Sequence, residues 1–262
     1  MTTLILPGVG GSEAAHWQTW LEGELADSVR IEQAEWNNPV LHTWRLNLDR
    51  ALLSASEPVW IVAHSFGCLV TMSALSSRVL ASKVAGVLLV APASPERFTL
   101  EGFARDIKQP TAEGQAHPPA LLSRVLPRAP LGLPIRLIAS RTDPWLSFEA
   151  AEWWATRWGA KLIDLGDAGH INVAAGFGAW PQVLVELNTL KFSSGAVQQF
   201  SLRQRNAVDA VITTPAAPES TDSTAASTTQ TIPTQTQASI QGEVEHLEQH
   251  HDALNQFTKQ VV

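Results

Sequence analysis

The chain has 262 residues, of which 45% are hydrophobic, and its net charge is −7 at pH 7. This length suits one sizeable domain with an appendage or two small domains, and an acidic balance without a basic cluster argues against nucleic-acid binding. A single cysteine, an amino terminus without a signal-peptide pattern and a longest apolar run about half the length that crosses a bilayer lead us to expect a cytoplasmic protein without membrane association.

The predicted strands and helices alternate along most of the chain. Apolar runs predict strands at residues 3–6, 29–32, 59–62, 84–92, 135–140 and 161–165. Apolar residues at helical spacing predict helices over residues 12–25, 40–55, 66–80, 146–158 and 177–190. This alternation predicts a parallel sheet with helices on both faces, whose ligands bind outside the carboxyl ends of the strands.

A glycine-rich turn, residues 7–12, follows the first predicted strand. Such a turn brings bare backbone N–H groups to the carboxyl edge of the sheet, where the N–H of Val9 or Gly10 is a candidate donor to an oxyanion. The turn lacks the lysine of a P-loop and the spacing of a dinucleotide fingerprint, which argues against a phosphate site. A plain loop without a special donor is the alternative.

The third predicted strand leads into Ala-His-Ser-Phe-Gly at residues 63–67, a variant of the G-x-S-x-G nucleophile elbow. The residues two before and two after Ser65 pack against each other in such a turn, and both are small here. The strained turn presents the Ser65 hydroxyl over the positive end of the following helix, where the Phe66 N–H is a second candidate oxyanion donor. The alternative is an ordinary turn with Ser65 as a helix N-cap.

Residues 94–134 interrupt the alternation of strands and helices. This segment contains seven prolines, too many for one long helix, so only the short stretches 98–107 and 120–125 are predicted to be helical. An excursion of this length at the active-site edge either shapes a pocket or is a surface loop, and both interpretations stay open.

Two further polar residues follow later strands of the predicted sheet. Asp143 follows the fifth predicted strand and His170 the sixth. The order Ser…Asp…His is that of α/β-hydrolases, and one helix plus one strand between Asp143 and His170 places both in neighbouring loops. We therefore predict that His170 reaches both Ser65 and Asp143. Asp167, three residues before His170, is the competing carboxylate and is expected to face away.

Several aromatic residues are predicted near this edge of the sheet. His16, Trp17, Trp36 and Trp145 are the candidates for an apolar pocket that takes an acyl or aryl group. His64, next to Ser65, is expected to be buried and structural. The sequence contains no metal-binding pattern of histidines and cysteines, so neither a metal nor another cofactor is expected.

Taken together, these motifs resemble the small α/β serine hydrolases of the retinoblastoma-binding-protein-9 type, which include bacterial esterase-like proteins. The matching stretches, over about residues 3 to 190, include residues 6–8, 16–17, 36–39, 62–67, 139–144 and 166–172. The resemblance implies the α/β-hydrolase fold with a compact six-stranded parallel sheet in the order 2-1-3-4-5-6. It also implies Ser65, Asp143 and His170 as the catalytic triad.

From the predicted triad we expect hydrolysis of a small carboxylic ester, and less readily of an amide, through an acyl-enzyme on Ser65. The expected partner is therefore a small-molecule ester. A protein-interaction module that keeps the hydrolase fold but does not use the triad is the alternative function.

The composition changes sharply near residue 193. We expect a hydrolase domain over residues 1–192 and a low-complexity tail over residues 193–262, rich in Ser, Thr, Gln, Ala and Pro. Within the tail, short helices are predicted at residues 197–212 and 243–261. The tail is either a largely disordered extension or a segment that docks onto the domain or a partner, and the sequence leaves both open.

Overall fold

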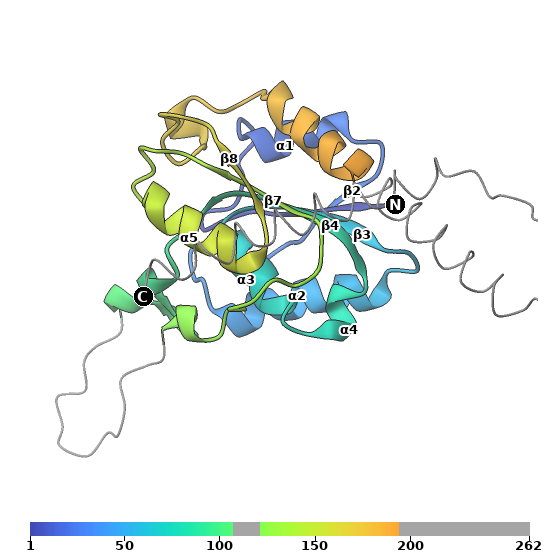
Figure 1. Cartoon of the computed structure of the whole chain (residues 1–262), viewed down its shortest axis with the longest axis horizontal. Helices are drawn as coiled ribbons and strands as arrows, with labels where there is room; N and C mark the ends of the chain where they lie inside the picture. Colours follow the sequence, from blue (N-terminus) through green and yellow to red (C-terminus); the bar gives the residue numbers. More distant parts are fainter. Residues whose placement is uncertain (107–120, 194–262) are drawn as a thin grey trace, which may run out of the picture. The chain divides into compact units, whose positions relative to one another are not determined.

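The computed structural model describes residues 1–106 and 121–193 (Figure 1). The predicted tail helices at residues 197–212 and 243–261 lie outside the described residues. Among the described residues, no helix is both long and apolar enough to cross a membrane.

A six-stranded parallel sheet forms the centre of the fold. Its strands are β1 (Thr3–Leu6), β2 (Ser28–Arg30), β3 (Val59–Ser65), β4 (Val84–Pro92), β7 (Ile135–Ala139) and β8 (Lys161–Asp164). They lie in the order β2-β1-β3-β4-β7-β8, and each pair of neighbours is parallel. The strands β5 (Phe98–Thr99) and β6 (Gly102–Phe103) form a separate antiparallel hairpin. When the strands of the main sheet are counted without this hairpin, their order is 2-1-3-4-5-6, and the prediction is confirmed.

Helices cover both faces of this sheet (Figure 1). The elements are α1 (Trp17–Glu24), α2 (Leu41–Ser54), α3 (Phe66–Ala74), α4 (Arg78–Ala81), α5 (Phe148–Trp158) and a last helix over residues 181–193. One apolar cluster joins the sheet to α2, α3 and α5, and a second joins it to α1 and the last helix. Neighbouring strand residues divide between the two: Ile61 belongs to the first cluster and Val62 to the second. This alternation follows from the two-residue period of a strand buried on both faces.

Two predicted helix starts lie several residues from the observed ones. The first helix begins at Trp17, not after Ser12, because the side chain of His16 caps it. The last helix begins at residue 181 and not at 177, with Pro181 at its first position, where the missing N–H costs no helical hydrogen bond.

The predicted helix over residues 98–107 is wrong in its described part, residues 98–106, which contains no α-helix. The segment after β4 consists of two single 3₁₀ turns, η1 (Pro95–Arg97) and η2 (Ala104–Asp106), on either side of the β5–β6 hairpin. Gly102 has a φ of 137°, a backbone conformation that side chains rarely adopt, and this allows the chain to reverse. The second predicted helical stretch is residues 120–125. Within its described part, residues 121–125, one 3₁₀ turn forms, η3 (Leu122–Arg124).

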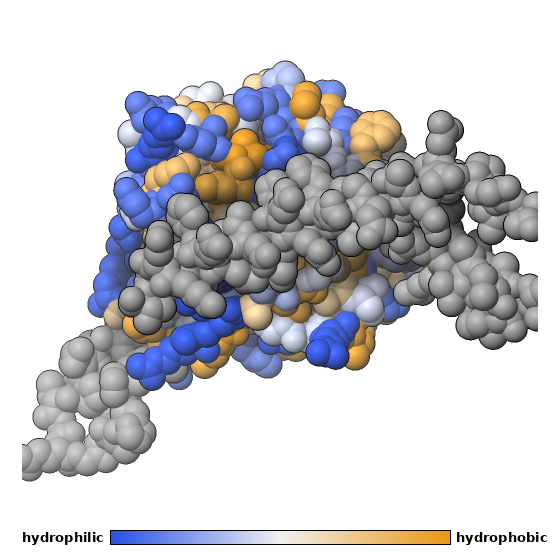
Figure 2. Space-filling model, in the orientation of Figure 1, coloured by the Kyte–Doolittle hydropathy of each residue, from blue (hydrophilic) through white to orange (hydrophobic). Residues whose placement is uncertain are grey.

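The surface of the described residues is mixed in polarity. Large apolar side chains such as Leu53, Val79 and Val185 are exposed. Figure 2 shows hydrophobic residues interspersed with hydrophilic ones on the visible described surface. Such a mixture is ordinary for a folded domain.

Two glycines allow the chain after β1 to cross directly against the turn at Ser65. A Cβ on Gly67 would lie 2.5 Å from the carbonyl oxygen of Leu6 and 2.6 Å from that of Pro7. A Cβ on Gly8 would lie 2.6 Å from the Cβ of Ser65. Backbone atoms cannot yield as a flexible side chain does, so these contacts fix the distance between the first loop and the elbow.

We therefore expect Gly67→Ala to lower the free energy of unfolding by about 1–3 kcal/mol, because the added methyl group overpacks a site closed by backbone. Urea unfolding of the purified variant measures this change. The matched control is Gly23→Ala in α1, where a Cβ meets nothing within 4 Å; this change should raise stability by about 0.5–1 kcal/mol. Equal effects of the two substitutions would contradict the steric argument.

Candidate active site

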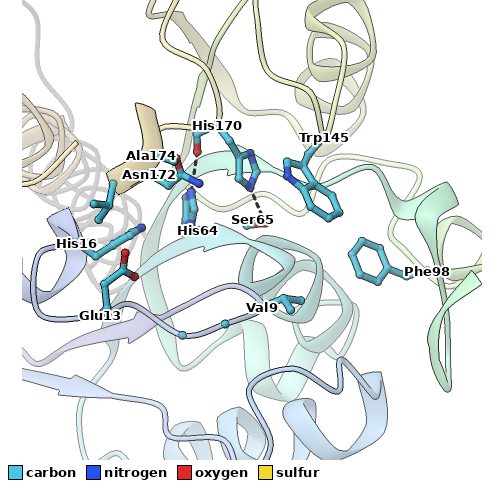
Figure 3. Close-up of a pocket in the computed structure, with 13 residues that line it drawn as sticks. Val9, Glu13, His16, His64, Ser65, Phe98, Trp145, His170, Asn172 and Ala174 are labelled. Atoms are coloured by element: carbon cyan, nitrogen blue, oxygen red, sulfur yellow. Dashed lines mark hydrogen bonds between the residues drawn. The ribbon is translucent and has the colours of Figure 1, made fainter. Parts of the chain in front are cut away.

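The three predicted site residues form one chain of hydrogen bonds at the carboxyl edge of the sheet. The Oγ of Ser65 lies 2.9 Å from Nε2 of His170 (Figure 3). The Nδ1 of the same ring lies 2.9 Å from both carboxylate oxygens of Asp143. Because a carboxylate accepts, Nδ1 carries the proton and Nε2 is left to accept from the Ser65 hydroxyl. The side chains of His170 and Asp143 are only 9% and 3% exposed, so little water competes for these bonds.

Asp143, and not Asp167, is the partner of His170. Asp143 follows β7, and its Oδ1 also accepts the backbone N–H of Trp145 at 2.8 Å. Asp167 lies in the same loop as His170 but is exposed. The two loops are joined by further bonds that sequence reasoning did not identify: Ser140 Oγ accepts the N–H of Ala168 at 2.9 Å. The carboxylate and the imidazole are therefore held by adjoining, cross-linked loops.

Ser65 occupies a strained turn between β3 and α3. Its φ of 52° and ψ of −121° lie outside the regions that most residues adopt. Strain of this kind persists where the surroundings over-determine the backbone, here the crossing at Gly8 and Gly67. The buried helix α3 starts at Phe66, so the positive end of its dipole lies beside the hydroxyl.

Among the candidate oxyanion donors, the N–H group of Gly10 is already engaged in a hydrogen bond within the protein. This N–H donates to the carbonyl oxygen of Trp36 at 2.9 Å, so the structure corrects this prediction. The N–H of Val9 has no hydrogen-bond partner among the described residues, and Val9 lines the cavity above Ser65. The N–H of Phe66 is the first of α3 and has no partner within the helix. Val9 and Phe66 are therefore the two donors that remain available.

A cavity of about 270 Å³ opens over the Ser65 hydroxyl. Figure 3 shows two unlike ends: Glu13, His16 and Asn172 on one side of His170, and Trp145 with Phe98 on the other. Sequence reasoning did not identify Glu13, Phe98 or Asn172, because nothing in the local sequence shows which way these side chains point.

Two predicted pocket residues do not line this cavity. Trp17 is fully buried beneath it, where its Nε1–H donates to the carbonyl oxygen of Ile171. Trp36 packs against the glycine-rich turn, within 3.2 Å of where a Cβ on Gly11 would be. Both side chains support the site from behind, because the loops they contact fold over them.

His16 combines a place in the cavity wall with a structural role. Its Nδ1 accepts the backbone N–H of Gln18 at 3.1 Å and so caps α1. Burial lowers the pKa of His16 from 6.5 to about 4, although the nearby Glu13 carboxylate acts in the opposite direction. The ring is therefore neutral at pH 7 and keeps the lone pair that the cap requires.

Cys68 is not a rival nucleophile. It is fully buried in α3, and burial raises the pKa of its thiol. The Sγ lies 3.4 Å from the carbonyl oxygen of Ala63. A buried thiol without thiolate character is unreactive, so Ser65 is the nucleophile candidate at this position.

Comparisons with known proteins agree with this architecture. A family model described as serine hydrolase matches residues 3–189. YdeN of Bacillus subtilis (strain 168), which is named as a hydrolase, is 26% identical over 200 residues, covering 72% of this chain and 95% of YdeN. The crystal structure of a YdeN-like hydrolase from Pectobacterium atrosepticum is 33% identical with a TM-score of 0.61, covering 74% of this chain and 91% of that one.

A more distant structure shows the fold alone. Mouse alpha/beta hydrolase domain-containing protein 10 is 15% identical with a TM-score of 0.50, and the match covers 75% of this chain and 90% of the mouse chain. The predicted α/β-hydrolase fold is thus confirmed.

The neutral state of His16 predicts a measurable pH dependence of stability. Between about pH 6.5 and 4 the unfolded chain binds a proton at His16 that the folded chain does not bind, so the free energy of unfolding falls as pH falls through this window. His16→Asn keeps an N-cap acceptor without a titrating ring. Urea unfolding at pH 7 and pH 5 should show a smaller loss of stability for this variant than for wild type; an identical loss would contradict the assignment.

Proposed function

We propose that this chain, which belongs to the serine hydrolase family because the family model matches residues 3–189, hydrolyses small carboxylic esters, and amides less readily, through an acyl-enzyme on Ser65. The observation that carries this proposal is the continuous path of hydrogen bonds from Ser65 through His170 to Asp143, each 2.9 Å long. This path supplies a nucleophile, a base and a group that orients the base.

The reaction begins when Ser65 Oγ attacks the ester carbonyl and its proton passes to Nε2 of His170. The ring becomes positively charged, and the Asp143 carboxylate on Nδ1 stabilises that charge without taking the proton. The tetrahedral intermediate then expels the alcohol, which takes the proton from Nε2. Water attacks the acyl-enzyme in the same way and releases the acid and free Ser65.

The N–H groups of Val9 and Phe66 would stabilise the oxyanion. They flank Ser65 from the first loop and from the start of α3, and both are free to donate. The positive end of α3 favours negative charge at this place.

The size and walls of the cavity favour a small substrate. A volume of about 270 Å³ lies at the low end for ligand pockets, which argues for a compact acyl or alcohol group. Phe98 and Trp145 offer an apolar wall for that group. The finer likeness to hydrolases of the retinoblastoma-binding-protein-9 type is part of this proposal and is supported by the shared motifs around Ser65, Asp143 and His170.

Replacing any member of the hydrogen-bonded path should remove most activity. We expect Ser65→Ala, His170→Gln and Asp143→Asn each to lower kcat for p-nitrophenyl acetate on the order of 10⁴-fold, because each breaks the proton path. Cys68→Ala is the matched control, and its activity should stay near that of wild type.

A fluorophosphonate probe distinguishes a hydrolase from an interaction module with an idle triad. Labelling of wild type that disappears in Ser65→Ala indicates an activated serine. Folded wild-type protein that takes up no label, or a Ser65→Ala variant that keeps near-full esterase activity, would overturn the proposed function.

Trp145 should affect substrate binding more than chemistry. Trp145→Ala removes the apolar wall, so KM for p-nitrophenyl butyrate should rise about tenfold, by the loss of roughly 1.5 kcal/mol of apolar contact, with a smaller rise for the acetate. The control is Trp153→Ala, which removes an indole that is 48% exposed on α5 and does not line the cavity. Equal KM values for the two variants would show that Trp145 does not contact the substrate.

A further inference from the structure

A hydrogen bond joins the residue before Ser65 to the backbone of His170. The Nε2–H of His64 donates to the carbonyl oxygen of His170 at 3.0 Å (Figure 3). A carbonyl only accepts, so this contact fixes the proton on Nε2 of His64. Two consecutive residues therefore contact His170: the ring of His64 donates to the His170 backbone carbonyl, and the Ser65 hydroxyl donates to the His170 ring.

A second ring N–H holds the next carbonyl of the same loop. The Nε1–H of Trp17 donates to the carbonyl oxygen of Ile171 at 2.8 Å. Trp17 is fully buried, and its ring lies edge-on to that of His64, with centroids 5.8 Å apart. Two donors from separate elements, α1 and β3, thus fix two consecutive carbonyls in the loop that carries the base.

The backbone of Ile171 requires such support. Its φ is 49°, in the left-handed region, which a β-branched residue rarely adopts. Its side chain is fully buried in the apolar cluster that also contains Trp17 and Trp180. A left-handed β-branched residue is strained and relaxes unless its surroundings hold it. Relaxation would rotate the peptide next to His170 and turn its imidazole away from Ser65.

We propose that His64 and Trp17 are positioning residues, whose ring N–H groups hold the carbonyls of His170 and Ile171 and thereby keep the imidazole in line between Ser65 and Asp143. This inference rests on the proposed function. Among the described residues, neither ring hydrogen-bonds the Ser65 hydroxyl or the Asp143 carboxylate. His64 lines the cavity, but its ring N–H is used by the carbonyl oxygen of His170, so both rings act through the loop.

The electrostatic surroundings of His64 suit this role. Burial lowers the pKa of His64 well below its ordinary value, and the neighbouring His170 and His16 act in the same direction. His64 therefore stays neutral and keeps its donor on Nε2. A neutral ring also does not oppose the positive charge that His170 acquires during the reaction, 4.9 Å away between centroids.

The test uses variants that differ in one N–H group. His64→Gln places an amide N–H where Nε2–H lies in the native ring, whereas His64→Met has a similar length and no donor. Trp17→Phe removes the indole N–H and keeps an aromatic ring. The control is Trp180→Phe, which loses an indole from the same cluster, where Trp180 packs against Trp17. Each variant is assayed below its thermal unfolding transition, with kcat and KM measured on p-nitrophenyl acetate.

The positioning role predicts a change in kcat with little change in KM. We expect His64→Met to lower kcat about 10²-fold and His64→Gln to recover at least about tenfold of that loss, the value of one restored hydrogen bond. Trp17→Phe should lower kcat about tenfold while Trp180→Phe stays within about twofold of wild type. Equal kcat for the Gln and Met variants, or equal effects of Trp17→Phe and Trp180→Phe, would overturn the proposal.

A second measurement separates this inference from the proposed function. The proton on Nδ1 of His170, shared with Asp143, should give a low-field NMR resonance that does not depend on turnover. We expect it to be sharp in wild type and His64→Gln and to be lost or broadened in His64→Met. A resonance that is unchanged in His64→Met overturns the positioning role. The two proposals can also fail separately. If the resonance is lost in His64→Met as expected but the fluorophosphonate probe does not label Ser65, the positioning role stands and the hydrolase proposal is overturned.

Discussion

The left-handed backbone of Ser65 is the constraint on which the rest of the site depends. A φ of 52° at Ser65, the last residue of the buried strand β3, directs its side chain toward the cavity at the carboxyl edge of the sheet. The conformation persists because Gly8 and Gly67 let the first loop cross the elbow at a distance that any side chain would block. The same crossing brings the N–H of Val9 to the cavity. One steric condition therefore sets both the position of the Ser65 hydroxyl and its electrostatic surroundings.

The other positive-φ residues that carry side chains lie at the same edge of the sheet. Among the described residues these are Ala91, next to the last residue of β4, and Ile171, in the loop that follows β8. The central strands β3 and β4 are completely buried, and their packing supplies the rigidity that holds such conformations. The buried central strands thus provide the support, and the residues with strained backbone lie at their carboxyl edge, where Ser65 and His170 meet.

The sequence predicted the sheet and the three principal residues because both follow from local patterns. Uninterrupted apolar runs identify β3 and β4, which are buried on both sides, and Ser65 ends the first of them. Asp143 and His170 come in the loops after β7 and the half-exposed edge strand β8, where the order of strands and helices places them. The sequence did not predict the role of Trp36. Its carbonyl oxygen accepts a hydrogen bond from the N–H of Gly10, and this bond joins segments that are distant in the sequence. Nor could composition show that Trp17 faces the core. The start of α1 was missed because histidine is an unusual N-cap.

Part of the cavity wall comes from an element outside the main sheet, as the position of Phe98 shows. This residue forms one wall of the cavity, yet it stands on the β5–β6 hairpin, outside the sheet that carries Ser65, Asp143 and His170. The hairpin is anchored by the bond from the N–H of Leu41 to the carbonyl oxygen of Leu100 and by the ring of Phe66 against Phe98. Part of the cavity wall and the hydrogen-bonded path from Ser65 to Asp143 thus come from separate stretches of polypeptide. Substitutions in the hairpin can therefore change the shape of the cavity without altering the bonds that join Ser65, His170 and Asp143.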